Sequence, residues 1–183
     1  MGGKESFAMK LDSLFMLDTI AENTGFVSDV SGFIGQYAHG NEPSHHVVYL
    51  YNYVDQPWKT QELIPEIFER FYKPKPDGLC GNDDCGQMSA WYIFSSMGFY
   101  PVDPISGEYV LGAPQMDKIF IQLTEDRVFV VEAKNLSRKN KYVKSVELNG
   151  KPVRGLTIKH EDIMSGGHLV FTMTDEPVKR VLK

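Results

Sequence analysis

The sequence predicts an α+β protein, in which a helical first half is followed by a small antiparallel β-sandwich-like module. Apolar residues recur every three to four positions up to about residue 100, and beyond it short β-rich runs alternate with turn residues. The chain has 183 residues, 42% hydrophobic and 23% charged, which is an ordinary globular composition with room for one or two domains. We therefore predict a helical region over residues 1–100 and a β-rich region over residues 101–183, with the change at Tyr100–Pro104.

The first predicted helix has its apolar residues at i, i+4, i+7 and i+8, on one face. These residues are Phe7, Leu11, Leu14 and Phe15. A Gly-, Ser- and Asn-rich connection, Asn23–Gly32, and a short apolar stretch, Phe33–Ala38, follow. Pro43 suits the first turn of the next helix, because its missing N–H would have no partner there. That helix is predicted to carry Val47, Val48, Leu50 and Tyr51.

Two further helices complete the first half. One is predicted from Trp58 to Tyr72, and the two prolines of Lys73–Pro76 end it. Its inner face would consist of Leu63, Ile64, Ile67, Phe68 and Phe71. The other is predicted over about Gly86 to Met97 and closes at Gly98, because glycine often terminates helices.

The second half contains six short β-rich runs at close spacing, which is typical of an antiparallel sandwich. They cover residues 109–111, 118–123, 128–131, 142–148, 156–159 and 169–173. Asn149–Gly150 is a strong hairpin signal, and Ser165–Gly167 forms another turn.

Charge and hydropathy exclude several classes of protein. The net charge is −5 and the pI is about 5.5, so the chain lacks the basic footprint of a nucleic-acid-binding protein. No run of 18 apolar residues exists, which predicts no membrane insertion. The N-terminal residues lack the apolar core of a signal peptide.

Cys80 and Cys85 are the two cysteines of the chain. Two thiols cannot complete a tetrahedral zinc site, and no histidine is close to them in sequence. Two free, buried thiols are the preferred interpretation, since free cysteine is among the most buried residue types. A disulfide between them stays open.

The first candidate site is the polar cluster His39–His46, just before an apolar helix. It combines an amide, a carboxylate, a hydroxyl and three imidazoles, the mixed donors and acceptors that sugar hydroxyls require. Helix capping by Asn41 or Ser44 is the alternative, but it would explain one of these residues only. His45 and His46 are adjacent and point about 100° apart on a helix, so they do not form the i, i+4 pair of a zinc site.

The second candidate site is Gly81–Asp84, ahead of the last helix of the first half. Asp83 and Asp84 could be simple partners of a helix dipole. A carboxylate in a polar cleft is also what a general base for water activation requires. The spacing of an EF-hand calcium loop is absent.

Aromatic residues near these clusters could form a stacking wall for a sugar ring, although such residues more often belong to a core. The candidates are Trp58, Trp91, Tyr92, Tyr49 and Tyr51. His160 and His168 are expected on the surface or in strands of the β half, with no partner identified.

The two clusters, read in full, resemble known signatures. Tyr37–His46 and Cys80–Tyr92, continuing to Gly98–Pro101, are similar to motifs of the glycoside hydrolase family 92 α-mannosidases, and so is the closing run Ile163–Phe171. The likeness covers nearly the whole chain. It implies that residues 1–100 come from an (α/α)6 barrel and that residues 101–183 form its β-rich C-terminal module.

The resemblance also implies an activity. Such enzymes remove terminal α-linked mannose from glycans, including N-glycans, with inversion and with the help of calcium. Two carboxyl groups roughly 6.5–9.5 Å apart would leave room for the attacking water. By motif match, Asp84 is the expected general base and Asp83 a helper. Some relatives carry an acid where this chain has Asn82.

Further residues are assigned by the same resemblance. The expected sugar-binding residues are His39, Asn41, Glu42, His46 and Asn82, and the expected calcium ligands are Asn41, Glu42 and Glu62. The general acid lies upstream of the matched region, so the isolated chain is expected to be inactive. Full-length relatives are expected to be exported to the periplasm or cell surface. Helix faces left open are expected to promote self-association.

Two other readings remain. A non-catalytic carbohydrate-binding or structural module would use the β half to bind glycan, and should show an exposed row of aromatic residues. An unrelated (α/α)6 enzyme of the glucoamylase type is the third reading, and the two signatures fit it less well.

Overall fold

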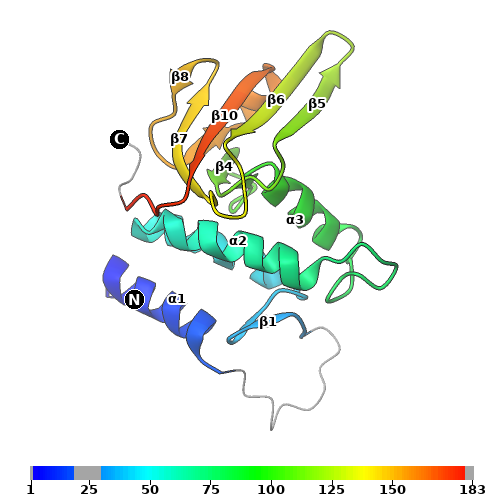
Figure 1. The fold of residues 1–183 in the computed structure, drawn as a ribbon. Helices are drawn as coiled ribbons and strands as arrows, with labels where there is room; N and C mark the ends of the chain where they lie inside the picture. The colour runs from blue at the N-terminus through cyan, green and yellow to red at the C-terminus, as the bar shows by residue number, and fades with distance from the viewer. Residues whose placement is uncertain (1, 19–29, 180–183) are drawn as a thin grey trace.

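The computed structural model describes residues 2–18 and 30–179, and these form layers around one central helix (Figure 1). Helix α2 (Pro57–Phe71) crosses the middle of the molecule. The β half lies on one side of it, and helix α1 (Lys4–Met16) and the hairpin of β1 (Phe33–Ile34) and β2 (Tyr37–Ala38) lie on the other. Residues 23–29 of the predicted connection lie outside the described residues.

The helical elements follow the predicted periodicity. Helix α1 buries Leu11 and Phe15 from its predicted apolar face. The next predicted helix is present as two 3₁₀ helices, η1 (Glu42–Ser44) and η2 (Val47–Val54), because its short run of β-branched and aromatic residues favours an α-helix weakly. Helix α3 (Gln87–Ser96) starts after Gly86 and ends two residues before Gly98, whose φ of 87° suits glycine.

The larger sheet of the β half has five strands, and one pair is parallel. Its order is β5 (Lys118–Thr124), β6 (Arg127–Lys134), β10 (Gly167–Thr174), β7 (Tyr142–Leu148) and β8 (Lys151–Pro152). Strand β10 runs antiparallel to β7 but parallel to β6. The prediction of a wholly antiparallel module is therefore wrong at this pair. After the β7–β8 hairpin the chain leaves the sheet, and it returns in the direction of β6.

A second sheet joins the two halves. It consists of β3 (Phe99–Tyr100), β4 (Glu108–Leu111) and β9 (Thr157–Lys159), all antiparallel. Between β9 and β10 lies helix α4 (His160–Met164), which the sequence did not predict because five residues are too few to show a helical period. The parts of the five-stranded sheet that were predicted as strands agree with the observed bounds to within a few residues.

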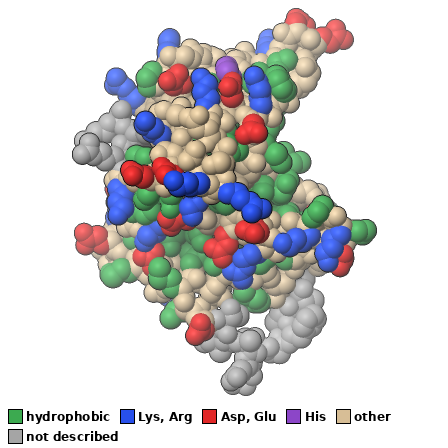
Figure 2. Space-filling model, viewed as in Figure 1, with side chains coloured by type: hydrophobic (Ala, Val, Ile, Leu, Met, Phe, Trp, Pro, Cys, Tyr) green, Lys and Arg blue, Asp and Glu red, His purple; other side chains and the backbone are tan. Residues whose placement is uncertain are grey.

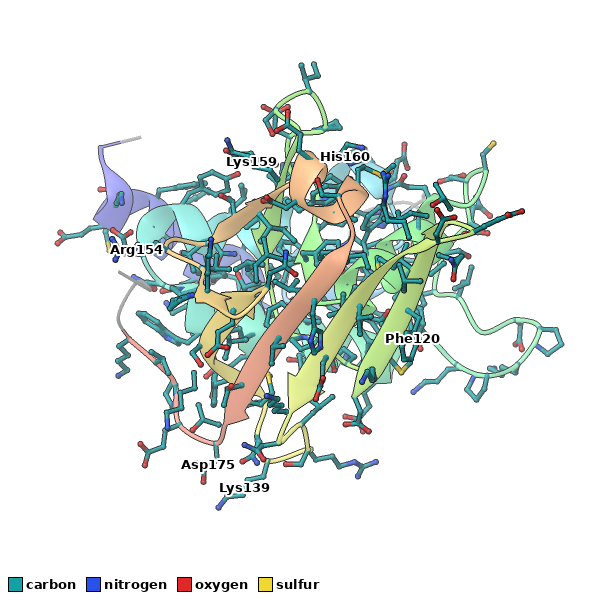
Figure 3. All side chains as sticks on the ribbon, turned by 90° about the horizontal axis from the view of Figure 1, so that it is seen from above. Phe120, Lys139, Arg154, Lys159, His160 and Asp175 are labelled. Atoms are coloured by element: carbon teal, nitrogen blue, oxygen red, sulfur yellow. The ribbon has the colours of Figure 1, made fainter. Side chains whose placement is uncertain are left out.

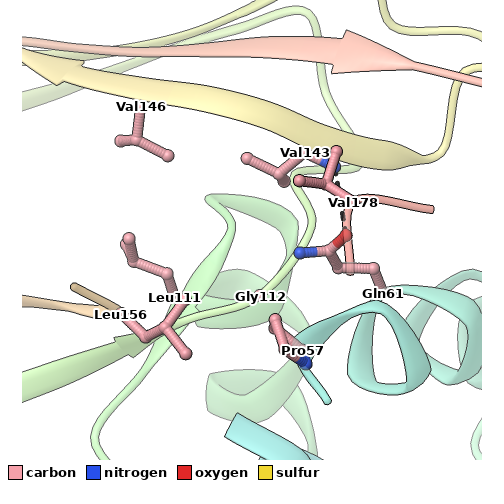
Figure 4. A pocket seen from close by; sticks show the side chains of 8 residues that line it. All are labelled: Pro57, Gln61, Leu111, Gly112, Val143, Val146, Leu156 and Val178. Atoms are coloured by element: carbon pink, nitrogen blue, oxygen red, sulfur yellow. Dashed lines mark hydrogen bonds between the residues drawn. The ribbon is translucent and has the colours of Figure 1, made fainter. Parts of the chain in front are cut away.

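Two apolar clusters form the core, one centred on the helices and one on the larger sheet, and Phe94 packs against both. Where α2, β4 and β7 meet, a cavity of about 10 Å³ remains, lined by residues that include Pro57 and Val146 (Figure 4). This volume suits about one water molecule. The division of the chain at residue 100 stays a prediction.

Surface charge is mixed on the face drawn in Figure 2, where lysine and arginine side chains alternate with acidic ones. Such mixing gives that face no strong field of one sign. Among the described residues, no helix combines the length and the apolar character needed to cross a bilayer.

Candidate functional site

The two polar loops singled out in the sequence meet at a pair of glycines. Gly40 follows strand β2, and Gly81 follows Cys80 in the connection between α2 and α3. A Cβ atom on Gly81 would lie 2.5 Å from the carbonyl oxygen of Gly40 and 2.8 Å from its Cα. Because no side chain fits into that contact, glycine is needed at position 81 for the loops to touch, whereas a Cβ atom on Gly40 would meet the Ser31 hydroxyl instead. Asn41 and Asn82 are the next residue along each loop.

His39, the residue before Gly40, is buried, and its ring lies between the hydroxyl groups of two tyrosines. Its Nδ1 atom lies 2.8 Å from the Tyr37 hydroxyl, and its Nε2 atom lies 2.8 Å from the Tyr72 hydroxyl. The Tyr72 hydroxyl donates its proton to the carbonyl oxygen of Met88 at 3.0 Å, so its oxygen must accept from His39 Nε2–H. His39 Nδ1 then accepts from Tyr37. Burial, with His45 adding, lowers the pKa of His39 to about 3, so this tautomer stays neutral.

His45 forms a second buried link between the loops. Its Nε2 donates to the carbonyl oxygen of His39 at 3.0 Å, so in the neutral ring its Nδ1 accepts from Gln87 Nε2 at 3.3 Å. Burial lowers the pKa of His45, which favours this neutral form. The indole N–H of Trp91 donates to the His45 carbonyl at 3.0 Å. The first loop is thus tied to the first and second turns of helix α3.

The Asp83 carboxylate stabilises the start of helix α3. Its Oδ1 accepts the backbone N–H of Ser89 at 2.9 Å, and its Oδ2 accepts the Ser89 hydroxyl at 3.2 Å. The helix-partner interpretation of this residue is confirmed. These bonds anchor the loop that carries Asp84.

Asp84 is exposed and occupies an unusual backbone conformation. Its φ is 46°, and the next two residues, Cys85 and Gly86, have φ values of 55° and 94°. Three consecutive left-handed residues are uncommon, and the two that carry a Cβ are strained by about 1 kcal/mol or more each. Strain of this kind concentrates at functional sites, and here it turns the chain sharply at the predicted general base.

The other predicted site residues differ in exposure. Glu42 and Asn82 are exposed, and Asn41 and His46 are half-buried. His39 differs from the expectation of a sugar contact, because it is fully buried and both its ring nitrogens are engaged by tyrosines. His39 therefore supports the first loop from the protein interior.

The expected metal ligands come from two different elements, η1 with its cap residue for Asn41 and Glu42, and helix α2 for Glu62. The Glu62 carboxylate accepts the Tyr142 hydroxyl at 2.5 Å, at the junction of α2 and β7. Within residues 2–18 and 30–179, no group of three His, Cys, Asp or Glu side chains is arranged to hold a metal ion. Asn41 and Glu42 remain adjacent oxygen donors at the start of η1.

The predicted aromatic wall is largely core. Trp91, Tyr49 and Tyr51 are at most 2% exposed, whereas Trp58 and Tyr92 are half-buried. The cysteines are both free, as preferred, but Cys85 is exposed and Cys80 only half-buried. The prediction of two buried thiols is therefore wrong.

The two histidines of the β half each lie close to a polar side chain. His160 Nδ1 lies 3.1 Å from the Tyr109 hydroxyl, and His168 Nε2 lies 2.9 Å from the Glu132 carboxylate. Sequence reasoning also missed Tyr72 and Gln87, which connect the two loops. Gln87 falls inside the second signature, but Tyr72 stands alone at the end of a helix, and no local pattern marks it.

The family profile and the solved structures agree on one family. The profile of the glycosyl hydrolase family 92 catalytic domain matches residues 1–175. The GH92 α-mannosidase BT3965 from Bacteroides thetaiotaomicron, solved in complex with mannoimidazole, is 44% identical, with a TM-score of 0.92 over 99% of this chain and 24% of that chain. The inverting mannosidase BT2199 from the same organism is 36% identical, with a TM-score of 0.83 over 100% of this chain and 26% of that chain.

A curated relative from Arthroderma benhamiae, described as an uncharacterized secreted glycosidase, is 29% identical over 140 residues. The match covers 75% of this chain and 18% of that relative. The chain thus spans about a quarter of the solved structures and less of the curated relative. The family profile includes both loops that meet at Gly40 and Gly81. This chain belongs to glycosyl hydrolase family 92.

Proposed function

We propose that this chain supplies part of the active site of an exo-acting, inverting α-mannosidase that removes terminal α-linked mannose from glycans. The similar structure BT3965 is described as an α-mannosidase and BT2199 as an inverting mannosidase. The observation that carries the proposal is the exposed, left-handed Asp84 beside the contact of the two signature loops.

Asp84 would act as the general base of a single displacement. Its carboxylate takes a proton from water, and the water oxygen attacks the anomeric carbon from the face opposite the leaving group. The glycosidic bond breaks, and the leaving oxygen takes a proton from an acid contributed by another part of the enzyme. Asp83 would help by anchoring the loop through Ser89.

Asn41, Glu42, His46 and Asn82 would contact the sugar hydroxyls around this base. The carboxylate of Glu42 accepts hydrogen bonds, and the two amides both donate and accept, which suits the hydroxyl groups of a hexose. His39 would serve these contacts indirectly, by holding the backbone of the first loop from below.

Calcium fits the described residues only in part. Calcium takes six to eight oxygen ligands, and Asn41 and Glu42 offer two. Glu62 would be a further candidate only if its carboxylate, which accepts the Tyr142 hydroxyl, turned toward the metal. We therefore propose Asn41 and Glu42 as two ligands of a shell completed by other parts of the enzyme, and we derive no step through the metal.

The alternative of a carbohydrate-binding module is disfavoured by the β half. Phe120 projects from the edge strand β5 and is 66% exposed (Figure 3), but Phe129 and Phe171 are fully buried. A single exposed ring, which is all that the described part of the β half offers, does not form the row that would stack along a glycan.

We also propose export for the complete enzyme, because the curated relative is described as secreted.

The test is Asp84→Asn in the complete enzyme, assayed on an aryl α-mannoside. Loss of a general base is expected to lower kcat by about 10²- to 10⁴-fold. The matched control is Asp126→Asn, an exposed aspartate in the turn between β5 and β6, which should leave kcat unchanged. An unchanged kcat for Asp84→Asn, or release of the α-anomer as first product by NMR, would overturn the proposal.

A further inference from the structure

Tyr72 connects three segments that converge on the site. It follows helix α2 directly, and its backbone forms a β-bridge with Leu79, two residues before Gly81. Its hydroxyl accepts from His39 Nε2 at 2.8 Å and donates to the Met88 carbonyl at 3.0 Å. One residue therefore contacts the loop before Gly81, the loop of His39 and the first turn of helix α3.

The ring of Tyr72 adds a further link. It stacks on Trp91 with a centroid distance of 5.9 Å and an interplanar angle of 7°. Trp91 in turn donates its indole N–H to the carbonyl of His45. The two parallel rings thus join helix α3 to both ends of the His39–His45 segment.

We propose that Tyr72 is a positioning residue, which fixes the loop of Asp84 against the loop of His39. The inference rests on the proposed function of Asp84. Tyr72 acts through His39 and through the Met88 carbonyl, and it makes no contact with substrate in this scheme. Without its hydroxyl, the His39 Nε2–H and the Met88 carbonyl lose their shared partner, and the first loop keeps only its links through His45 to helix α3.

The first test is Tyr72→Phe in the complete enzyme, with kcat and KM measured separately on an aryl α-mannoside. A shift of a base by about 1 Å lowers rates by up to about 10²-fold, so we expect kcat to fall by roughly tenfold to a hundredfold while KM changes little. The control is Tyr109→Phe, which removes a half-buried hydroxyl beside His160 in the β half and should leave kcat unchanged. A lower melting temperature with unchanged kcat for Tyr72→Phe would overturn the inference.

The double variant with Asp84→Asn separates the inference from the proposed function. If Tyr72 acts through the Asp84 loop, adding Tyr72→Phe to Asp84→Asn should lower kcat little further, whereas full additivity would overturn the positioning role. If Asp84→Asn alone leaves kcat unchanged, the proposed function fails, and the inference with it.

The hydrogen-bond relay has its own test, independent of activity. Nitrogen-15 NMR of the histidine rings in the 183-residue chain should show His39 as the Nε2–H tautomer. The Tyr72 hydroxyl donates its hydrogen bond to the Met88 carbonyl, so it can only accept one from His39. The Nδ1–H tautomer in the wild-type chain would overturn the relay.

Discussion

The side-chain oxygen of Gln61 on helix α2 accepts a hydrogen bond from the backbone N–H of Val143 on strand β7 at 3.1 Å (Figure 4). Both residues are buried. The neighbouring Glu62 accepts the hydroxyl of Tyr142. Two consecutive helix residues thus hold two consecutive strand residues from the other half of the chain.

Gln61→Ala should weaken this junction. The substitution leaves the Val143 N–H buried without its acceptor, which should lower the free energy of unfolding by about 1–3 kcal/mol. Urea unfolding of the 183-residue chain measures the change. The control, Gln36→Ala, alters an exposed glutamine and should have little effect. Equal effects of the two variants would contradict the buried role.

Gly81→Ala should separate the two signature loops. The new Cβ would overlap the Gly40 backbone, and the loops would have to move apart, at about 1–3 kcal/mol of stability. Gly150→Ala is the comparison, because that glycine has a φ of 74° but open space around it, so only backbone strain of about 1 kcal/mol applies. Melting temperatures would rank the two variants, and a smaller loss at Gly81 would refute the close contact.

The two cysteines should differ in reactivity. Burial raises the pKa of the Cys80 thiol to about 11, so it carries little thiolate at about pH 8. Cys85 is exposed, and iodoacetamide should alkylate it first. Mass spectrometry at successive times gives both rates. A Cys85→Ser variant should then label slowly when folded and quickly in urea, and equal rates in the two conditions would argue against the burial of Cys80.

Acid should destabilise the fold through His39. The folded-state pKa is lowered to about 3, whereas the model-compound value is 6.5. Below pH 6.5 the His39 ring is protonated in the unfolded chain but stays neutral in the folded chain. This contribution to the free energy of unfolding therefore falls as the pH drops towards 3. His39→Gln should therefore lose less stability between about pH 7 and pH 5 than the wild type. The comparison variant is His160→Gln, which changes an exposed ring, and an equal loss of stability in His39→Gln and the wild type would contradict the burial of His39.

The 183-residue chain alone should not hydrolyse aryl α-mannosides, because it spans about a quarter of the solved relatives and the proposed general acid lies elsewhere. Calorimetry should detect calcium weakly or not at all, since two oxygen donors fall short of a calcium shell. Turnover that depends on Asp84 would show that the chain holds a complete centre.

Light scattering should show association, driven by exposed apolar residues such as Met9 and Ile93, which are 63% and 56% exposed.

The sequence predicted most elements because their signals are local. The apolar face of α1, the prolines that follow α2 and the glycine that closes α3 each act within one or two turns. The parallel pairing of β10 with β6 could not be predicted, because it depends on where the chain re-enters the sheet after more than thirty residues. Helix α4 is too short to show a period.

The candidate site was predicted as two separate loops, and its internal connections were not. Polar residues in the motifs identified Asp84 and the Asn41 loop. No local pattern distinguished the buried His39, which supports the first loop, from the half-buried His46. The role of Tyr72 could not be predicted either, because it arises only when three segments come together.

Strand β10 lies between β6 and β7, although it follows both of them in chain order. During synthesis, β6 and β7 therefore leave the ribosome well before the strand that separates them. Until β10 emerges, the apolar faces of both have an open central position that another chain could fill. A nascent chain is thus most exposed to mispairing between the synthesis of β7 and that of β10, and a chaperone that shields β6 and β7 in this interval would aid folding most.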